Sequence, residues 1–378
     1  MARADVERSA QVALRTKTAI IDCDIHNYVN GLADLFPYLS ARWRRHAETI
    51  GMRGRVALAE GLSYPRNSPL ASRADSWPEH GRPGSSLELM RHQLLDLFGI
   101  EIGVLNCLFL VGPQLHHGWA AALAQAVNDW QVVEWLEKEP RLRASILIPY
   151  EYPDLAVHEI RRAALAHRGF AQVLILARTR EPLGRPHYWP IYEAASEVGL
   201  PIGIHFGVLG GNPVTSCGWP SFYLEEHTGM AQAFQVQVAS MVLEGVFERF
   251  PRLNVALVEG GFAWAPSLMW RMDQHWKRLG EETPHLKRAP SEYVKEHVAL
   301  TTQPMEEPAN PRHLLDVLDM LKDGPRLMFA TDYPHWDFDA PDRAFPAQVP
   351  EDVRRLIFAT NARRFYKLDG RSSPALSV

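Results

Sequence analysis

Residues 20–26 read IIDCDIH, a short apolar run in which two potential metal ligands, Asp24 and His26, arrive together. One residue separates them, so on an extended strand both side chains point to the same side. Apolar runs of this length, rich in Val, Ile and Leu, are typical of strands buried on both faces of a parallel sheet. The run therefore predicts a parallel strand that carries half of a metal site at its carboxyl end.

Runs of the same kind recur along the chain and alternate with longer segments of helical period. Gly99 and Gly199 stand just past two of the helical segments, directly before the next strand. This alternation favours an α/β fold of the (β/α)8 TIM-barrel type, although the same units also build an open doubly wound sheet. The predicted strands are 19–24, 102–108, 144–148, 171–176, 201–205, 254–259, 297–301 and 326–331, and the clearest predicted helices are 87–97, 120–138, 188–198, 229–244 and 311–321.

The length of the chain fits one barrel with insertions, because such a barrel needs about 250 residues and the chain has 378. We expect a single, distorted barrel domain over residues 19–370, with a flexible leader at 1–18 and a flexible tail at 371–378. Residues 52–86 are rich in Arg, Pro, Gly and Ser and follow the first strand, which predicts a lid insertion on the catalytic face. Residues 207–227 carry many aromatic side chains, and we interpret them as pocket wall after the fifth strand.

Composition and charge argue against several classes of partner. Hydrophobic residues make up 46% of the chain and charged residues 22%, as in an ordinary folded domain. The net charge of −4, without a basic run, argues against binding to nucleic acid or anionic membranes. Cys23, Cys107 and Cys217 lie far apart, so neither a disulfide framework nor a thiolate zinc site is expected. No apolar stretch predicts a membrane span. We therefore expect a cytoplasmic protein whose partner is a small molecule.

Two further predicted strands end in metal-binding side chains. Residues 202–205, IGIH, end in His205, and residues 329–332, FATD, end in Asp332. Taken singly, a histidine after a strand is more often structural, and the aspartate can cap a helix. In a barrel, however, the carboxyl ends of the strands converge on one face. Two imidazoles and two carboxylates suit one divalent ion, Zn²⁺ first and Mn²⁺ second, with one position left open. The predicted ligands are Asp24, His26, His205 and Asp332.

Several motifs together resemble the amidohydrolase superfamily, in particular the branch that contains aminocarboxymuconate semialdehyde decarboxylase. Besides His205, they are DCDIH at 22–26, GVFERFPRLNVALVEGGFAW at 245–264 and ATDYPHWD at 330–337. The resemblance extends over about residues 20–368. It implies a distorted barrel with one catalytic metal, in a homodimer or a larger homo-oligomer.

Two residues depart from the pattern of that branch. Where relatives have a His-x-His pair on the first strand, this chain has Asp24 and His26. Where the decarboxylase relatives place a catalytic histidine at the end of the sixth strand, this chain has Glu259. The second departure weakens the transfer of a decarboxylase mechanism. Glu259 can serve as a further ligand, as a general base, or only as a hydrogen-bonding partner of neighbouring strand ends.

Hydrolysis is the first functional hypothesis. The metal would activate a water molecule that attacks a carbonyl in an amide, ester, lactone or carbon–carbon bond of an aromatic or hydrophobic substrate. Asp332 is the first candidate for the proton acceptor, since the strand-eight carboxylate is the superfamily's usual proton carrier, and Glu259 is the second. His227 or His335 would protonate the leaving group.

Two alternatives remain open. The first is metal-dependent, non-oxidative decarboxylation of an aromatic or dienoic acid, by a lyase in which Arg178 or Arg271 helps to hold the carboxylate. The second is a barrel that binds a ligand without catalysis.

His116 and His117 follow the second strand, and at most one of these neighbours is expected to face the site. The aromatic residues predicted to bind the substrate are Trp219, Phe222, Tyr223, Trp264 and Trp336.

Overall fold

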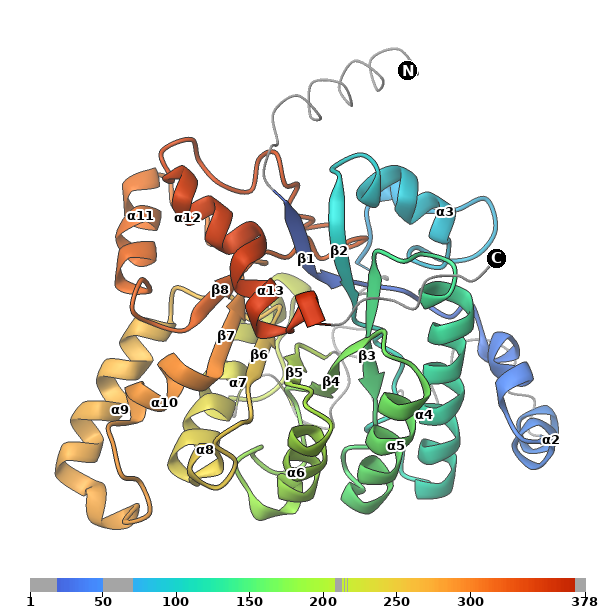
Figure 1. Ribbon diagram of the computed structural model, residues 1–378, viewed down its shortest axis with the longest axis horizontal. Coiled ribbons are helices and arrows are strands. Elements are labelled where there is room, and N and C mark those ends of the chain that lie inside the picture. Colours follow the sequence, from blue (N-terminus) through green and yellow to red (C-terminus); the bar gives the residue numbers. More distant parts are fainter. Residues whose placement is uncertain (1–18, 50–70, 208–212, 214, 216, 371–378) are drawn as a thin grey trace.

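The computed structural model describes residues 19–49, 71–207, 213, 215 and 217–370. Eight parallel strands stand side by side in sequence order, and helices lie around their outside (Figure 1). The predicted (β/α)8 barrel is confirmed, and the open doubly wound alternative is wrong because its strand order would not follow the sequence. The strands are β1 (Ile20–Ile25), β2 (Ile100–Leu105), β3 (Leu142–Leu147), β4 (Phe170–Leu176), β5 (Ile202–His205), β6 (Val255–Val258), β7 (Val298–Thr301) and β8 (Arg326–Met328).

The segment after β8 brings the last strand against the first. Cys23 N donates to Phe329 O over 2.9 Å, and Asp332 N donates to Asp24 O over 3.0 Å. His26 N donates to Tyr333 O over 2.7 Å, so the contact continues past the end of both strands. The predicted eighth strand extended to residue 331, but the strand ends at Met328 because the chain turns from its sheet neighbour toward β1. This nearly closed barrel places Asp24 and Asp332 next to each other.

The strands form because their residues suit burial on both faces. Every residue of β1, β3, β4, β5, β6 and β7 is buried, as the continuous apolar runs predict. Small side chains such as Ala171, Ala256 and Ala299 pack in one buried cluster with Ile21 and Met328. The larger aliphatic residues pack in a second cluster with the surrounding helices.

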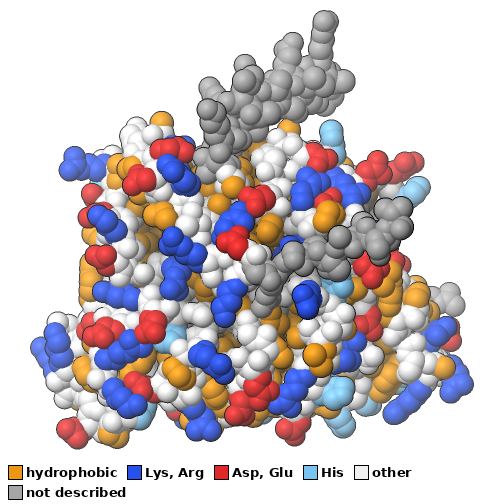
Figure 2. Space-filling view, viewed as in Figure 1, with side chains coloured by type: hydrophobic (Ala, Val, Ile, Leu, Met, Phe, Trp, Pro, Cys, Tyr) orange, Lys and Arg blue, Asp and Glu red, His pale blue; other side chains and the backbone are white. Residues whose placement is uncertain are grey.

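The helical shell starts and ends close to the predicted bounds. Over the face shown in Figure 2, Lys and Arg side chains lie interspersed with Asp and Glu, as the small net charge predicts. Among the described residues, no helix combines the length and apolar character that crossing a membrane requires. The α-helices are α2 (Ala41–Thr49), α3 (Leu87–Met90), α4 (His117–Gln131), α5 (Pro153–Ala166), α6 (Trp189–Glu197), α7 (Tyr223–Leu243), α8 (Val246–Arg249), α9 (Ala265–Leu279), α10 (Pro290–His297), α11 (Pro311–Met320), α12 (Glu351–Arg355) and α13 (Asn361–Phe365).

One helix boundary changes the interpretation of the site. The predicted helix 229–244 begins at Tyr223, so the last residues of the predicted pocket-wall loop 207–227 belong to the first turns of α7. Glu225 explains the early start, because its carboxylate accepts a hydrogen bond from Ser221 N over 2.8 Å. Acidic residues in a first turn also interact favourably with the helix dipole.

Part of the predicted lid insertion packs on the segment after β8. Residues 50–70 lie outside the described part of the chain. Beyond them, Arg73 N donates to Pro334 O over 3.0 Å, and Trp336 N donates to Ala71 O over 2.7 Å. Gly84 O accepts from Tyr28 N over 3.0 Å. The described end of the insertion therefore lies beside the motif that carries Asp332, while the lid itself stays a prediction.

Candidate active site

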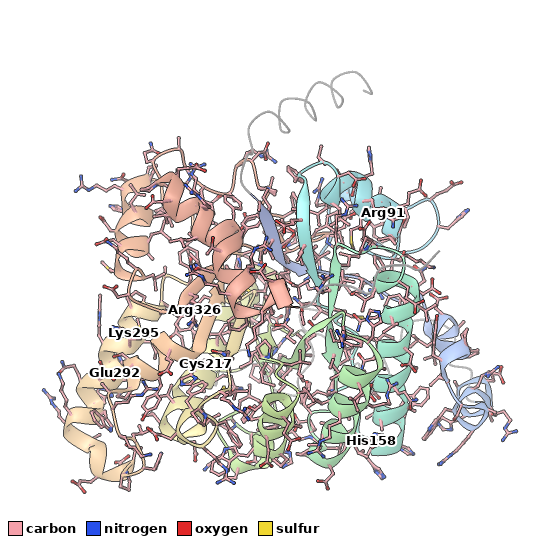
Figure 3. The ribbon with its side chains drawn as sticks, in the orientation of Figure 1. Arg91, His158, Cys217, Glu292, Lys295 and Arg326 are labelled. Atoms are coloured by element: carbon pink, nitrogen blue, oxygen red, sulfur yellow. The ribbon has the colours of Figure 1, made fainter. Side chains whose placement is uncertain are left out.

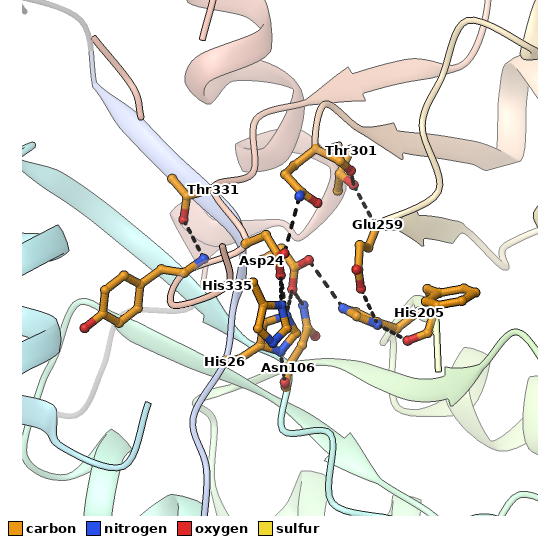
Figure 4. A network of polar contacts seen from close by, with 12 residues as sticks. Asp24, His26, Asn106, His205, Glu259, Thr301, Thr331 and His335 are labelled. Carbon is orange, nitrogen blue, oxygen red and sulfur yellow. Dashed lines mark hydrogen bonds and ion pairs between the residues drawn. The ribbon is translucent and has the colours of Figure 1, made fainter. Parts of the chain in front are cut away.

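Four potential metal ligands meet at the carboxyl ends of three strands (Figure 4). Asp24 and His26 come from the end of β1, His205 ends β5, and Glu259 directly follows β6. One ligand atom from each lies within 4.8 Å of the others, and all four residues are buried. Asp24 joins the two imidazoles, because its Oδ1 lies 3.5 Å from His26 Nε2 and its Oδ2 lies 3.3 Å from His205 Nε2.

Both imidazoles turn a lone pair toward carboxylate oxygens. A backbone carbonyl only accepts hydrogen bonds, so Nδ1 of His26 donates to Asn106 O over 2.7 Å. For the same reason, Nδ1 of His205 donates to Phe206 O over 2.5 Å. In the neutral imidazole, the remaining Nε2 is then an acceptor. Within the described part of the chain, His205 Nε2 and Asp24 Oδ2 are buried without a hydrogen-bond partner. Acceptors that face each other in this way fit a cation between them, and the imidazole and carboxylate donors suit a divalent metal.

Asp332 joins the cluster through His26. Its Oδ1 lies 2.7 Å from His26 Nε2 and 2.7 Å from His335 Nδ1. These three residues form a second potential ligand group that shares His26 with the first. His335 Nε2 lies 2.9 Å from the Tyr28 hydroxyl, and its ring stacks on that of His26 with centroids 4.4 Å apart. The four predicted ligands thus form one continuous cluster, and Glu259 adds a contact of 3.4 Å with His205 Nδ1.

The two carboxylates at the edges of this cluster contact different imidazoles. Glu259 Oε2 lies 3.4 Å from His205 Nδ1, whereas Asp332 Oδ1 lies 2.7 Å from His26 Nε2. The first group contains Glu259 and the second contains Asp332, so the side-chain contacts described here join Asp332 to the Asp24 and His205 side chains by way of His26. Whether Asp332 or Glu259 is the fourth ligand therefore stays a prediction.

The pKa values of the clustered residues are shifted strongly, as expected where several carboxylates and imidazoles are buried together. Burial lowers the pKa of His26, but the carboxylates of Asp24 and Asp332 outweigh burial and raise that pKa to about 9. Burial and the neighbouring carboxylates raise the pKa of Glu259 well above its usual range. Burial also raises the pKa of Asp332, but His335 and His26 overcome this and lower it below the usual range. The contacts thus favour the protonated forms of His26 and Glu259 and the ionised form of Asp332.

Two of these residues have an unusual backbone conformation. Glu259 and Asp332 both have φ of +59°, in the left-handed region that residues with a side chain rarely adopt. Each is held there by its amide, since Glu259 N donates to Thr301 Oγ1 over 3.1 Å and Asp332 N to Asp24 O over 3.0 Å. Such strain concentrates at functional sites, which supports a functional role for both carboxylates.

His227 reaches the cluster through two intermediate side chains. Its Nε2 lies 3.1 Å from Asp337 Oδ2, which also accepts a hydrogen bond from Gln303 Nε2 over 2.7 Å. The same nitrogen of Gln303 lies 3.3 Å from Asp332 Oδ2. His227 therefore does not touch the cluster itself, while His335 does.

The five aromatic residues predicted to bind the substrate lie in different surroundings. Trp336 donates from Nε1 to the Tyr223 hydroxyl over 3.2 Å, and its ring lies 5.6 Å from that of His227. Trp264 donates to Gly260 O over 2.9 Å, which ties it to the loop after Glu259. Trp219 and Phe222 are exposed. The structure thus groups Tyr223 and Trp336 with His227, and substrate binding by all five stays a prediction.

Other residues considered from the sequence lie away from the cluster. His116 and His117 are both exposed, and His116 accepts from Trp119 N over 3.3 Å as the N-cap of α4. At most one of the pair was expected to face the site, and none of the contacts described for them joins either histidine to the cluster. Arg271 is exposed on α9. Arg178 is buried and forms an ion pair with Glu226 over 3.0 Å.

Sequence reasoning missed two buried amides at the site. Asn106 follows β2 and donates to Asp24 Oδ1 over 2.8 Å. Gln303 follows β7 and bridges two carboxylates, as described above. Each lies just past the end of a strand, at the edge where the predicted ligands were found. That position was the available signal, but an amide is common in loops and does not by itself suggest a metal site.

Comparisons with known proteins agree with this fold. The amidohydrolase family model matches residues 21–368. The gamma-resorcylate decarboxylase of Rhizobium radiobacter is 28% identical over 343 residues, which cover 85% of this chain and 100% of that protein.

Two solved structures share the fold. The 2,6-dihydroxybenzoate decarboxylase from Rhizobium has a TM-score of 0.65 and 23% identity, covering 93% of this chain and 100% of the other. A dihydroxybenzoic acid decarboxylase from Polaromonas sp. JS666, with bound manganese and the inhibitor 2-nitroresorcinol, has a TM-score of 0.63 and 20% identity over 93% and 98% of the two chains. The gamma-resorcylate decarboxylase relative favours the decarboxylation alternative over hydrolysis.

Proposed function

The chain belongs to the amidohydrolase family, and from this premise we propose that it is a metal-dependent decarboxylase of hydroxylated aromatic acids. It would release the carboxyl group as carbon dioxide without oxidation. The observation that carries the proposal is the buried cluster of imidazole lone pairs and carboxylates at the carboxyl ends of the strands, in a chain whose relatives are decarboxylases. Hydrolysis, placed first from the sequence, becomes the alternative.

The residues of the first ligand group would hold one divalent metal. Asp24, His26 and His205 offer three ligand atoms, and Asp332 or Glu259 offers the fourth. The bound metal would supply positive charge that holds and polarises the oxygens of the acid. Manganese in one of the related structures supports Mn²⁺, and the donor set also suits the Zn²⁺ expected from the sequence.

The chain's own residues would move the proton that the reaction consumes. When the carbon–carbon bond to the carboxylate breaks, its electron pair stays on the ring carbon, and that carbon takes up one proton. Asp332 and His335 share a 2.7 Å contact, and His335 also contacts the Tyr28 hydroxyl. We assign the proton donor to His335, whose ring the ionised Asp332 holds through this contact, with Tyr28 on its outer side. His335, held by Asp332, would thus take the catalytic role of the histidine that decarboxylase relatives are expected to have where this chain has Glu259.

An apolar wall beside the cluster suits an aromatic ring. It is formed by residues after β2, at and after the end of β3 and within β4, and Leu176 in this wall pairs in register with His205. A ring hydroxyl beside the carboxyl group would favour proton uptake by the ring carbon, because it donates electron density there. We therefore propose a hydroxyl group next to the carboxyl group as the shared feature of the substrates. The wall consists of Cys107, Leu108, Phe109, Val111, Gly112, Leu147, Ile148, Tyr150, Leu174 and Leu176.

Isotope labelling distinguishes the two reactions. The enzyme loaded with Mn²⁺ or with Zn²⁺ is incubated in D₂O with hydroxylated aromatic acids that carry ¹³C in the carboxyl group. We expect ¹³CO₂ and one deuterium on the vacated ring carbon, and no product from chelator-treated enzyme. If these acids stay intact while an ester, amide or lactone gains ¹⁸O from labelled water, the chain is a hydrolase. If neither reaction occurs with either metal, the hypothesis of a non-catalytic barrel is favoured.

The assembly of the chain is a separate proposal. The expected homodimer or larger homo-oligomer stays a prediction, and light scattering on the purified chain tests it. A mass of one chain, 42.8 kDa, would contradict it.

A further inference from the structure

Asn106 contacts four consecutive residues of the segment that carries the first two ligands. Figure 4 shows it beside two of them, Asp24 and His26. Its Nδ2 donates to Asp24 Oδ1 over 2.8 Å and to Cys23 O over 3.2 Å. Its backbone N donates to Ile25 O over 2.8 Å, and its backbone O accepts from His26 Nδ1 over 2.7 Å. We propose that Asn106 is the positioning residue of the metal site, a role that rests on the proposed function.

These contacts decide which atoms the two ligands present. Because Asp24 Oδ1 receives the amide hydrogen of Asn106, Asp24 Oδ2 is left facing His205 Nε2 over 3.3 Å. Because the carbonyl of Asn106 holds the Nδ1 hydrogen of the His26 ring, the lone pair on Nε2 points into the cluster. One residue thereby orients both a carboxylate and an imidazole, as partners behind metal ligands do.

The amide of Asn106 is itself locked in one orientation. Its Oδ1 accepts from Ser145 Oγ over 2.6 Å and from Gln172 Nε2 over 2.9 Å. The Gln172 carbonyl in turn accepts from the Tyr366 hydroxyl over 3.1 Å. Both hydrogens and both lone pairs of the Asn106 side chain are therefore used. A flipped amide would turn its oxygen toward Asp24 and its hydrogens toward two donors, so the observed orientation is strongly favoured.

His205 provides an internal contrast. Its Nδ1 is held by the carbonyl of the next residue, Phe206, and not by Asn106. Loss of the Asn106 side chain should therefore disturb Asp24 directly and leave the orientation of His205 unchanged. Such residues behind metal ligands typically contribute about 10-fold to 100-fold to metal affinity.

The test measures Mn²⁺ affinity of the full chain by equilibrium dialysis. Asn106→Leu removes the amide at similar volume, and we expect the Mn²⁺ dissociation constant to rise by about 10-fold to 100-fold. Asn128→Leu is the matched control, because the Asn128 amide is equally buried and donates to Leu147 O and Glu159 Oε1 away from the ligands. We expect the control to keep its Mn²⁺ affinity within about twofold, since it changes only packing and stability.

The outcomes separate this inference from the proposed function. If wild type binds Mn²⁺ tightly and Asn106→Leu binds it equally well, or if both leucine variants lose affinity equally, the role of Asn106 is overturned while the metal site stands. If wild type binds no Mn²⁺, the metal site of the proposed function fails and this inference fails with it.

A milder variant covers the case in which Asn106→Leu does not fold. Ser145→Ala removes one of the two hydrogen bonds that lock the Asn106 amide and touches no ligand. We expect its Mn²⁺ dissociation constant to rise about threefold, by the loss of part of one hydrogen bond. An unchanged constant for Ser145→Ala, with circular dichroism showing an intact fold, would then overturn the inference.

Discussion

Buried carboxylates at opposite ends of the strands have different partners. Before the amino end of β3, Glu139 accepts from Arg91 Nε over 2.7 Å and from Arg141 Nε over 2.8 Å. Arg91 is labelled beside α3 in Figure 3. At the carboxyl ends, Asp24 Oδ2 faces the bare Nε2 of His205 over 3.3 Å. Glu139 has charged partners within the chain, whereas Asp24 and His205 face each other with acceptor atoms and suit a cation.

The pKa values show the same contrast. Burial raises the pKa of Glu139, but hydrogen bonds from Arg141 and Arg91 outweigh it and lower the pKa to about 2. Burial and like charges raise the pKa of Glu259 well above its usual range, with no guanidinium among the causes. A carboxylate paired with arginine contributes to stability, while one that faces lone pairs is suited to binding. We therefore expect variants of the cluster to change turnover or metal affinity, and variants of Glu139 to change the free energy of unfolding.

The largest effect is expected at the proposed proton donor. Asp332→Asn removes the carboxylate that holds His335, the proposed proton donor, and should lower kcat for decarboxylation by about 10³-fold. The ¹³CO₂ assay measures this, with Asp129→Asn on the outer helix α4 as control, because Asp129 pairs with Arg162 and not with the cluster. Turnover by Asp332→Asn within a few-fold of wild type would exclude the proposed role.

The second effect is the competition of protons with the metal. His26 has a pKa of about 9 in the metal-free chain, and a metal must displace its proton. Below that pKa, the apparent metal affinity should therefore fall at least about 10-fold for each pH unit, or about 100-fold between about pH 8 and pH 6. Calorimetry in buffers of different ionisation enthalpy should show proton release on Mn²⁺ binding. Binding without proton release would contradict this protonation of His26.

A smaller effect is expected at His227. His227→Asn shortens the side chain that contacts Asp337, whose carboxylate also binds Gln303 beside Asp332. Loss of one charge-assisted hydrogen bond at this distance from the cluster should lower kcat by about 10-fold and leave Mn²⁺ affinity unchanged. A loss as large as that of Asp332→Asn would instead place His227 in direct contact with the reacting atoms.

The smallest effect is expected at the opposite end of the strands. Glu139→Gln should lower the free energy of unfolding by about 1 kcal/mol, since the arginines are partly exposed and screened. The pKa of Glu139 is about 2 in the folded chain against an ordinary 4.5, so its contribution is complete above about pH 4.5 and is lost as the pH falls toward 2.

Urea unfolding at neutral pH and near pH 3 measures this difference between wild type and Glu139→Gln. The difference should shrink at the lower pH, and kcat of the variant should stay near that of wild type. A difference that grows as the pH falls would contradict the assigned ionisation of Glu139.

The sequence predicted the strands well because each is a short apolar run with a clear end. The carboxyl ends of these runs also indicated the candidate site, because Asp24, His26, His205 and Asp332 are the polar residues found there. The exact residues at which the strands end were harder to predict from the sequence. The eighth strand stops early because its last residues turn to meet β1, a contact between segments about three hundred positions apart.

The rest of the site depends on contacts that no local pattern encodes. Asn106 and Gln303 are ordinary polar residues after strands until the barrel brings their amides to Asp24 and Asp332. The early start of α7 makes His227 a helical residue, and it is accompanied by the hydrogen bond from Ser221 N to the Glu225 carboxylate in the first turn. His116 was a reasonable candidate by position, yet it serves as the cap of α4.

The most direct test of the account is the metal content of the chain after dialysis against Mn²⁺ and removal of free metal. The account predicts one ion per wild-type chain by elemental analysis, one ion for Glu139→Gln, and less than a tenth of an ion, as an order of magnitude, for His205→Ala, because His205 supplies the unpaired Nε2. Wild type without stoichiometric metal, or His205→Ala with as much metal as wild type, would contradict it.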